Sequence, residues 1–222
     1  MAFELLGSGD PETYSAVLAT LEVSALSLLV SLLIGIPLGF SLGHFEFAGK
    51  RTLRTVVDTL LALPTVVIGL LVYSFLSHRG PLGDLGLLFT IPGMAIGLII
   101  LALPIVVALT ATAMESLDHR LRAHLLTLGA TRRQLALTSL WEARYAVLAA
   151  AVMAFGRVVS EVGIAMMVGG NIKWHTRTIT TAIALETGKG EFAVGIALGM
   201  VLMVMALGVN ISLSFLRRKS RP

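Results

Sequence analysis

Long apolar stretches without a charged residue most constrain what this chain can fold into. A hydrocarbon core of about 30 Å needs about 20 helical residues at a rise of about 1.5 Å each. Four stretches of about that length or more lack Asp, Glu, Lys and Arg: residues 23–43, 59–77, 85–114 and 192–216. A fifth stretch, residues 145–168, is also apolar but is interrupted by Arg157 and Glu161. The sequence therefore predicts an all-α membrane protein with five transmembrane helices.

The expected spans extend beyond the uncharged stretches. Asp10 and Pro11 offer an N-cap and a first-turn proline, so the first helix should begin well before residue 23. We expect one transmembrane domain over residues 1–222, with spans at about 15–43, 53–77, 89–114, 145–169 and 191–216. Residues 115–144 would then form a cytoplasmic segment, and residues 170–190 an external loop.

Composition agrees with a multi-pass protein of the cell membrane, in contact with lipid. The chain is 56% hydrophobic and only 14% charged, which is too few charges for an ordinary soluble domain. Its net charge of +4 does not indicate nucleic-acid binding, because the basic residues lie in short segments beside apolar spans. The absence of cysteine excludes a disulfide framework and thiolate metal sites.

Lysine and arginine are distributed unequally between the two sets of flanking segments. One set carries twelve of them: Lys50, Arg51, Arg54, Arg120, Arg122, Arg132, Arg133, Arg144, Arg217, Arg218, Lys219 and Arg221. The other set carries only four: Arg79, Lys173, Arg177 and Lys189. Because cytoplasmic flanks are enriched in these residues, the first set should face the cytoplasm. The N-terminus is then outside and the C-terminus inside, in agreement with an odd number of spans.

Residues 115–144 carry an amphipathic pattern. Leucines recur at helical spacing in its first half: Leu117, Leu121, Leu125 and Leu128. A second short stripe follows with Leu137, Leu140 and Trp141, and Gly129 should interrupt the helix between the two stripes. A helix–glycine–helix of this kind can dock on a partner protein, or it can rest on lipid headgroups. The periodicity alone fits both interpretations.

The sequence shows no catalytic or metal-binding pattern. It contains no His-Glu-x-x-His, no Gly-x-Ser-x-Gly and no Walker loop for a nucleotide. The five histidines are scattered over predicted loops without the spacing of metal ligands. We therefore expect neither an enzyme nor a metal site.

Two ionisable residues lie inside the fourth predicted span. Arg157 and Glu161 are four residues apart, so both project from one face of a helix and can pair there. A charge within a span usually faces a bundle interior or a water-filled cavity, which makes a role in the substrate path one interpretation. A structural ion pair that ties this span to its neighbours is the other.

The predicted external loop is rich in hydroxyl groups and glycine. Val168-Gly169-Gly170-Asn171 is followed by Thr176-Arg177-Thr178-Ile179-Thr180-Thr181, with Lys173 and His175 between them. Hydroxyl donors and a few cations suit an oxyanion without trapping it, so this segment could line an anion entry path. It could equally be a loop that only connects two spans.

Several stretches resemble the permease subunits of type I ATP-binding-cassette importers, most closely the tungstate importer permeases. Gly35-Ile36-Pro37-Leu38-Gly39 and the run from Leu61 to Leu70 are similar to patterns of that superfamily. Leu128-Gly129-Ala130 resembles its cytoplasmic coupling motif. The following stretches are similar to molybdate and sulfate permeases: Phe155-Gly156-Arg157, Ser160 to Gly163, and Gly170-Asn171-Ile172. Residues 176–190 narrow the resemblance to tungstate-type permeases.

One departure lies in the coupling motif. The superfamily motif opens with Glu-Ala-Ala six residues before its glycine, whereas this chain has Ala123, His124 and Leu125 there. The usual Leu-Pro at the end of the motif is replaced by Trp141-Glu142. The acidic residue of the motif is therefore missing, while Gly129 and Ala130 remain.

The resemblance implies the type I importer fold and a homodimeric channel. Two cytoplasmic ATPases would use ATP and Mg²⁺, and an external binding protein would deliver tungstate or a related tetrahedral oxyanion. The permease would pass the anion to the cytoplasm by alternating access, with no cofactor or ATPase site of its own. Permeation of molybdate, sulfate or another small solute is an alternative. From a different class, the chain could be an ATP-independent channel or a membrane scaffold.

The resemblance and the patterns above together give two sets of candidate residues. The expected substrate path comprises Arg157, Glu161, Gly170, Asn171, Thr176 and Arg177. In it, Arg157 would offset oxyanion charge and Glu161 would orient Arg157. The expected contact with the ATPase comprises Leu117, Leu121, Ala123, His124, Leu125, Leu128, Gly129 and Ala130.

Overall fold

The computed structural model describes residues 11–117 and 125–219, and the described residues form helices and turns without a strand. The helices, in chain order, are α2 (Pro11–His44), α3 (Lys50–Leu60), α4 (Thr65–Leu76), η1 (Gly83–Leu85), α5 (Ile91–Glu115), α7 (Arg132–Glu142), α8 (Arg144–Val159), α9 (Gly163–Gly169), α10 (Ile179–Gly188) and α11 (Phe192–Lys219). The expected all-α fold is confirmed.

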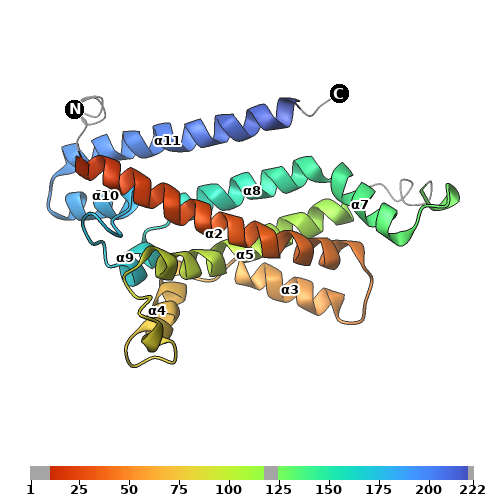
Figure 1. Cartoon of the computed structure of the whole chain (residues 1–222), viewed down its shortest axis with the longest axis horizontal. Helices are drawn as coiled ribbons and strands as arrows, with labels where there is room; N and C mark the ends of the chain where they lie inside the picture. Colours follow the sequence, from red (N-terminus) through yellow and green to blue (C-terminus); the bar gives the residue numbers. More distant parts are fainter. Residues whose placement is uncertain (1–10, 118–124, 220–222) are drawn as a thin grey trace.

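Three described helices are long and apolar enough to cross a membrane by themselves. They are α2, α5 and the first part of α11, residues Phe192–Ile211. Two further candidates are bent pairs: α3 with α4 at 93°, and α7 with α8 at 58°. In Figure 1 the helices α2, α5 and α11 run in the same direction, and α8 returns between them.

The predicted second span is not one helix. Residues 53–77 are divided between α3 and α4, with the break directly before Pro64. Proline has no N–H to donate and disfavours helical backbone in the residue before it, so helix ends fall at this position. Pro64 then precedes the first helical residue of α4 in extended conformation. The bend turns α4 away from α3, as Figure 1 shows.

Two other predicted segments also differ from the helices of the structure. The apolar stretch 145–169 is split into α8 and α9, with residues 160–162 outside both. The segment 170–190, expected as a loop, contains the ten-residue helix α10. Thr178 begins α10 with a reciprocal capping box, in which its side chain and that of Thr181 satisfy each other's backbone N–H groups.

Helices α2 and α5 approach each other closely enough for backbone contact. A Cβ atom at Gly39 would lie 2.6 Å from the carbonyl oxygen of Val107, and one at Gly43 would lie 2.5 Å from that of Ala111. Gly35, four residues before Gly39, faces Val106 in the same row. Small residues at this spacing allow membrane helices to pack closely, so glycine is required here for its size.

Buried serine and threonine residues continue this row of small residues toward the start of α2. Thr20, Ser24, Ser27 and Ser31 are all buried. Thr20 and Ser27 donate to the carbonyl oxygens four residues earlier, which satisfies them inside the bundle. Thr20 also accepts a hydrogen bond of 2.9 Å from the N–H of Ile179, which ties the start of α10 to α2.

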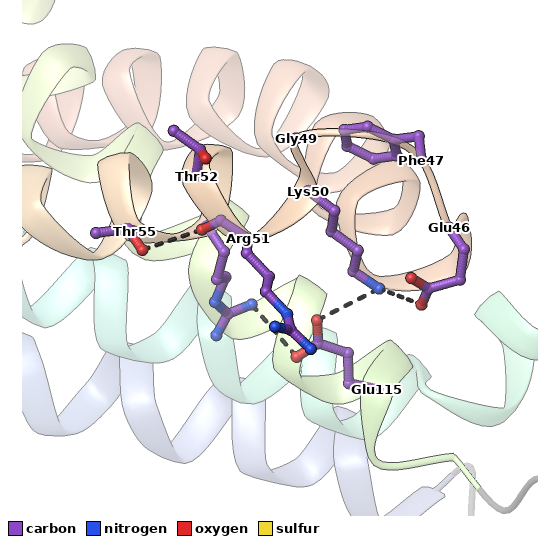
Figure 2. A pocket seen from close by; sticks show the side chains of 9 residues that line it. Glu46, Phe47, Gly49, Lys50, Arg51, Thr52, Thr55 and Glu115 are labelled. Carbon is purple, nitrogen blue, oxygen red and sulfur yellow. Dashed lines mark hydrogen bonds and ion pairs between the residues drawn. The ribbon is translucent and has the colours of Figure 1, made fainter.

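Ion pairs join α3 to α5 at the end of the molecule where α5 finishes. Lys50 pairs with Glu46 at 2.8 Å and with Glu115 at 3.8 Å, as Figure 2 shows. Arg54 lies 3.6 Å from the other oxygen of Glu115 and donates to the hydroxyl of Thr112 at 2.7 Å. These contacts hold α3 alongside the last turns of α5.

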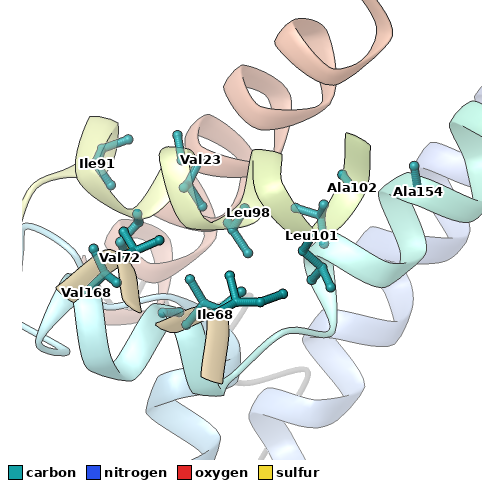
Figure 3. Packing of buried hydrophobic residues seen from close by; sticks show 14 of the residues in the cluster. Val23, Ile68, Val72, Ile91, Leu98, Leu101, Ala102, Ala154 and Val168 are labelled. Carbon is teal, nitrogen blue, oxygen red and sulfur yellow. The ribbon is translucent and has the colours of Figure 1, made fainter. Parts of the chain in front are cut away.

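The main apolar core lies where α5 meets α2, α4, α8 and α9. Met94, Ala102, Ala154, Ile164 and Val168 are each 0% exposed. Figure 3 shows core residues directed at one another, with Ile68 and Val72 of α4 beneath Leu98 of α5. The core therefore fixes α8 and α9, which flank Glu161, against α5.

Because α2 packs closely on α5, we expect a single methyl group added between them to lower the stability of the protein. Gly39→Ala places its Cβ against the carbonyl of Val107, so the helices must move apart, at a cost of about 1–3 kcal/mol of unfolding free energy. The matched control is Gly199→Ala in α11, where no atom lies within 4 Å of the added Cβ. Thermal unfolding of the purified protein in detergent should show a lowered midpoint for Gly39→Ala only. Equal midpoints for both variants would contradict the packing argument.

Candidate functional site

The break between α8 and α9 holds the intramembrane ion pair. Arg157 lies in the last turn of α8, and Glu161 lies between the two helices. The Arg157 NH1 group donates to Glu161 Oε2 at 2.9 Å, as the spacing predicted. The other oxygen, Oε1, accepts the N–H of Ile164 in the first turn of α9 at 3.2 Å. Each charge therefore lies at the helix end whose dipole it complements.

The two partners of this pair differ in exposure. The Glu161 side chain is 4% exposed, whereas that of Arg157 is 40% exposed. A buried carboxylate needs a counter-charge and hydrogen-bond donors, and Arg157 and Ile164 supply both. Within the described residues, the Arg157 guanidinium makes this one polar contact. Its remaining N–H donors stay open toward the accessible side.

Gly170, Asn171 and Thr176 lie in a tight turn after α9. Gly170 and Asn171 both have left-handed backbone, with φ of 72° and 50°. A Cβ at Gly170 would lie 2.6 Å from Cδ1 of Phe89, so a side chain does not fit there. The Thr176 hydroxyl is fully buried, donates to the carbonyl of Gly169 and accepts the N–H of Ile172 at 3.1 Å. The turn is held by its own polar groups.

Arg177 and Lys173 share one carboxylate. The Arg177 guanidinium donates to Glu12 in the first turn of α2 and, through Nε, to Asn171 Oδ1 at 3.2 Å. Lys173 pairs with the same carboxylate at 2.6 Å. The Arg177 side chain is only 15% exposed. Glu12 thus offsets one of the two positive charges of Lys173 and Arg177, and these contacts fasten the turn to α2.

Threonines connect the segment after this turn to the ion pair. The Thr180 hydroxyl donates to the carbonyl of Glu161 at 3.1 Å, and it lies 2.9 Å from the hydroxyl of Thr178. The six residues predicted for the substrate path therefore form two groups, the pair at the α8–α9 break and the turn at residues 170–177. Sequence reasoning flagged the threonine run but missed Glu12, because no spacing links residues so far apart.

The predicted helix break at Gly129 is confirmed. Gly129 has φ of 76°, its N–H bonds the carbonyl of Leu126, and the N–H of Ala130 bonds that of Leu125. This pair of bonds is the Schellman arrangement that ends a helix. Thr131 then starts α7 through a capping box with Gln134. A helix, a glycine turn and a second helix follow one another here.

The side chains of this segment point in different directions. Leu128 lies in the turn, 82% exposed, and Leu137 and Trp141 are also exposed. Leu117 instead packs beside Met114 and Ala143, so it contacts the helices of its own chain. Leu125 is half-buried. Three residues predicted for the ATPase contact, Leu121, Ala123 and His124, lie outside the described residues.

Helices long and apolar enough to cross a membrane, with an ion pair at the break between two helices, indicate an integral membrane protein. The described residues contain no group of three His, Asp or Glu side chains that could hold a metal ion. The chain belongs to the family described as binding-protein-dependent transport system inner membrane component, which matches residues 35–222.

Two relatives cover almost the whole chain. The tungstate uptake system permease protein TupB of Campylobacter jejuni subsp. jejuni is 48% identical over 217 residues, 98% of this chain and 91% of that protein. The molybdenum transport system permease protein ModB of Escherichia coli K12 is 32% identical over 213 residues, 89% of this chain and 93% of that protein. The chain is thus similar along its length to permeases of oxyanion transport systems.

The arrangement of helices also matches a solved transporter. A chain of the MetNI methionine ABC transporter, in an inward-facing form, superposes with a TM-score of 0.78 at 16% sequence identity. The match covers 95% of this chain and 97% of that chain. It shows that the fold is that of a type I importer permease, as expected.

Proposed function

We propose that the chain is the permease of an ATP-driven importer that passes tungstate or a related tetrahedral oxyanion into the cytoplasm. The identity of 48% to a tungstate uptake permease, over 98% of the chain, carries this proposal. Two copies would form the pathway, two cytoplasmic ATPases would drive it, and an external binding protein would deliver the anion. The permease itself would hydrolyse no ATP.

Charge and shape support one orientation of the proposed importer. The ends of α2 and α5, the start of α3 and the whole of α7 lie at one end of the molecule in Figure 1. Most of the twelve basic flanking residues belong to this end, which supports its placement in the cytoplasm. The turn at residues 170–177 and the start of α2 would then face outside.

Arg157 is the residue best suited to meet the anion. Its side chain is 40% exposed, and its guanidinium keeps donors open after pairing with Glu161. A guanidinium can donate two parallel hydrogen bonds to an oxyanion, which gives direction as well as attraction. Glu161 is buried and bonded on both oxygens, so its role would be to orient Arg157. The neighbouring negative charge would also keep the anion's binding weak enough for release.

The turn at residues 170–177 would contribute its shape to the path, and few hydrogen bonds to the anion. The predicted path residues in this turn are Gly170, Asn171, Thr176 and Arg177. Their polar groups are used within the turn or by Glu12, and little of their hydrogen-bonding capacity remains for an anion. We infer that this turn fixes the outer end of the path against α2. It holds the threonine link to Glu161 in place.

The turn at Leu128-Gly129-Ala130 would dock on the ATPase. Leu128 is the most exposed large apolar side chain among those described, and a glycine turn between two helix ends presents it. An exposed leucine at a membrane protein's cytoplasmic tip fits a hydrophobic cleft of a partner. Leu117 would instead anchor the segment to the permease, through its contacts beside Ala143.

Replacing Arg157 tests the path. Arg157→Ala should lower tungstate uptake into membrane vesicles roughly 10- to 100-fold, because a charged hydrogen-bond donor is lost. Because Arg157→Ala leaves the buried Glu161 carboxylate without its counter-charge, the double variant Arg157→Ala, Glu161→Gln, which removes both charges, should lose uptake to the same extent while the ATPase still co-purifies. Arg79→Ala removes an exposed arginine from the α4–η1 connection and is the matched control. Normal uptake by Arg157→Ala would refute the role of this residue.

A proline at the docking turn tests the coupling. Gly129→Pro cannot adopt the positive φ and loses the bond from its N–H to Leu126, so the turn must rearrange. ATP hydrolysis stimulated by the binding protein and uptake should both fall at least about tenfold, as for a lost contact of about 1.4 kcal/mol or more. Gly190→Pro is the matched control, with φ of 88° and one N–H bond to Thr187 at the other end of the molecule. Equal loss in the two variants would mean that general misfolding, not lost docking, explains the effect.

The binding protein that works with this permease identifies the substrate. Calorimetric titration of that protein with tungstate, molybdate and sulfate should give the lowest Kd for tungstate. A lower Kd for molybdate would favour the second candidate, a molybdate permease, which the identity of 32% to ModB makes the natural alternative. A lower Kd for sulfate than for tungstate and molybdate would exclude both a tungstate permease and a molybdate permease.

A further inference from the structure

The breaks in the second and fourth predicted spans lie side by side. The second span restarts at Thr65, the first residue of α4, and the fourth restarts at Gly163, the first residue of α9. A Cβ atom at Gly163 would lie 3.6 Å from the hydroxyl oxygen of Thr65 and 3.2 Å from Glu161 Oε1, so both oxygens lie within 4 Å of one point. Further along, a Cβ at Gly69 would lie 3.3 Å from the Cα of Ile164, so α4 and α9 stay in contact beyond the breaks. Thr65 therefore belongs to the surroundings of the ion pair.

Thr65 carries a hydroxyl group that the protein leaves free. The residue is partly buried, yet its hydroxyl makes no hydrogen bond within the described part of the chain, and its oxygen is not enclosed. The threonines at the start of α10 differ, because the hydroxyls of Thr178, Thr180 and Thr181 bond one another and the backbone. Thr65 is therefore the threonine beside the break whose donor is available to a ligand.

Thr65 and Arg157 approach the Glu161 carboxylate from two different helices. Arg157, in α8, donates to Oε2 at 2.9 Å. Thr65, in α4, lies near Oε1, which already accepts the N–H of Ile164. The guanidinium keeps N–H groups open, and the hydroxyl is unbonded, so both donors can serve a ligand. A tetrahedral oxyanion presents oxygens in several directions and can accept hydrogen bonds from two helices at once.

We propose that Thr65 is a further residue of the substrate path, and that its hydroxyl donates a hydrogen bond to the passing oxyanion. Arg157 would hold the same anion from α8, so the breaks of the two spans would form two walls of the path. A hydroxyl gives the anion a direction without adding charge, which suits release. This inference rests on the proposed function and adds α4 to the elements that contact the anion.

Two substitutions at this position separate the hydroxyl from the shape of the side chain. Thr65→Val keeps the shape and removes the donor, whereas Thr65→Ser keeps the donor and removes a methyl group. Tungstate uptake by vesicles that contain the assembled importer should fall roughly tenfold in Thr65→Val, the effect of a lost hydrogen bond to a charged group. Uptake by Thr65→Ser should stay close to that of the unmodified protein. A threonine needed only for its shape would give the opposite order.

Thr59→Val is the matched control, because the Thr59 hydroxyl already donates to the carbonyl of Thr55 inside α3. This variant should transport normally. Thr65→Ala is a second variant without the donor, which a helix tolerates, and it should lose uptake like Thr65→Val. Uptake is compared at equal amounts of importer assembled with its ATPase, so a loss of assembly is not counted as a loss of transport.

The outcomes separate this inference from the proposed function. Normal uptake by Thr65→Val, or an equal loss in Thr65→Val and Thr65→Ser, would overturn the role of the hydroxyl while the unmodified importer still transports tungstate. If the unmodified importer takes up no oxyanion, the proposed function is wrong and this inference is overturned with it.

Discussion

The backbone contact between α2 and α5 is the constraint on which the rest of the bundle depends. In lipid no hydrophobic effect draws apolar helices together, so close packing has to hold them. Gly39 and Gly43 let the two backbones meet, and this leaves other faces of α5 to carry the remaining helices. At Gly97, an added Cβ would lie 2.5 Å from a methyl group of Ile164 in α9. Helix α5 is therefore packed closely against more than one neighbour.

Breaks in the other helices are possible because their freed polar groups find partners. Backbone at membrane depth can depart from a helix only where its N–H and carbonyl groups are satisfied by protein or water. At the α8–α9 break, the Glu161 side chain accepts the N–H of Ile164, and Thr180 donates to the Glu161 carbonyl. The ion pair and the threonines thus stabilise the same break that exposes Arg157. Structural and functional interpretations of the pair do not exclude each other.

The apolar stretches and the local spacings could be read from the sequence. The pairing of Arg157 with Glu161 and the helix end at Gly129 depend on residues four or fewer positions apart, and both were predicted correctly. The bond between Arg177 and Glu12 joins residues 165 positions apart in the chain, which no local pattern encodes. The 93° bend between α3 and α4 also went unforeseen. Pro64 marks where a helix can break, but packing against α9 decides the direction of α4.

Paired cations would let the proposed path pass a divalent anion without trapping it. Lys173 and Arg177 share the single negative charge of Glu12, and Arg157 pairs with Glu161. Two unit charges about 4 Å apart attract by about 4 kcal/mol at an effective dielectric constant of about 20, so several unpaired cations would hold an oxyanion for long times. One half-exposed guanidinium beside a carboxylate gives direction with little net attraction. Selection among oxyanions would then fall to the binding protein, and the permease would supply only passage.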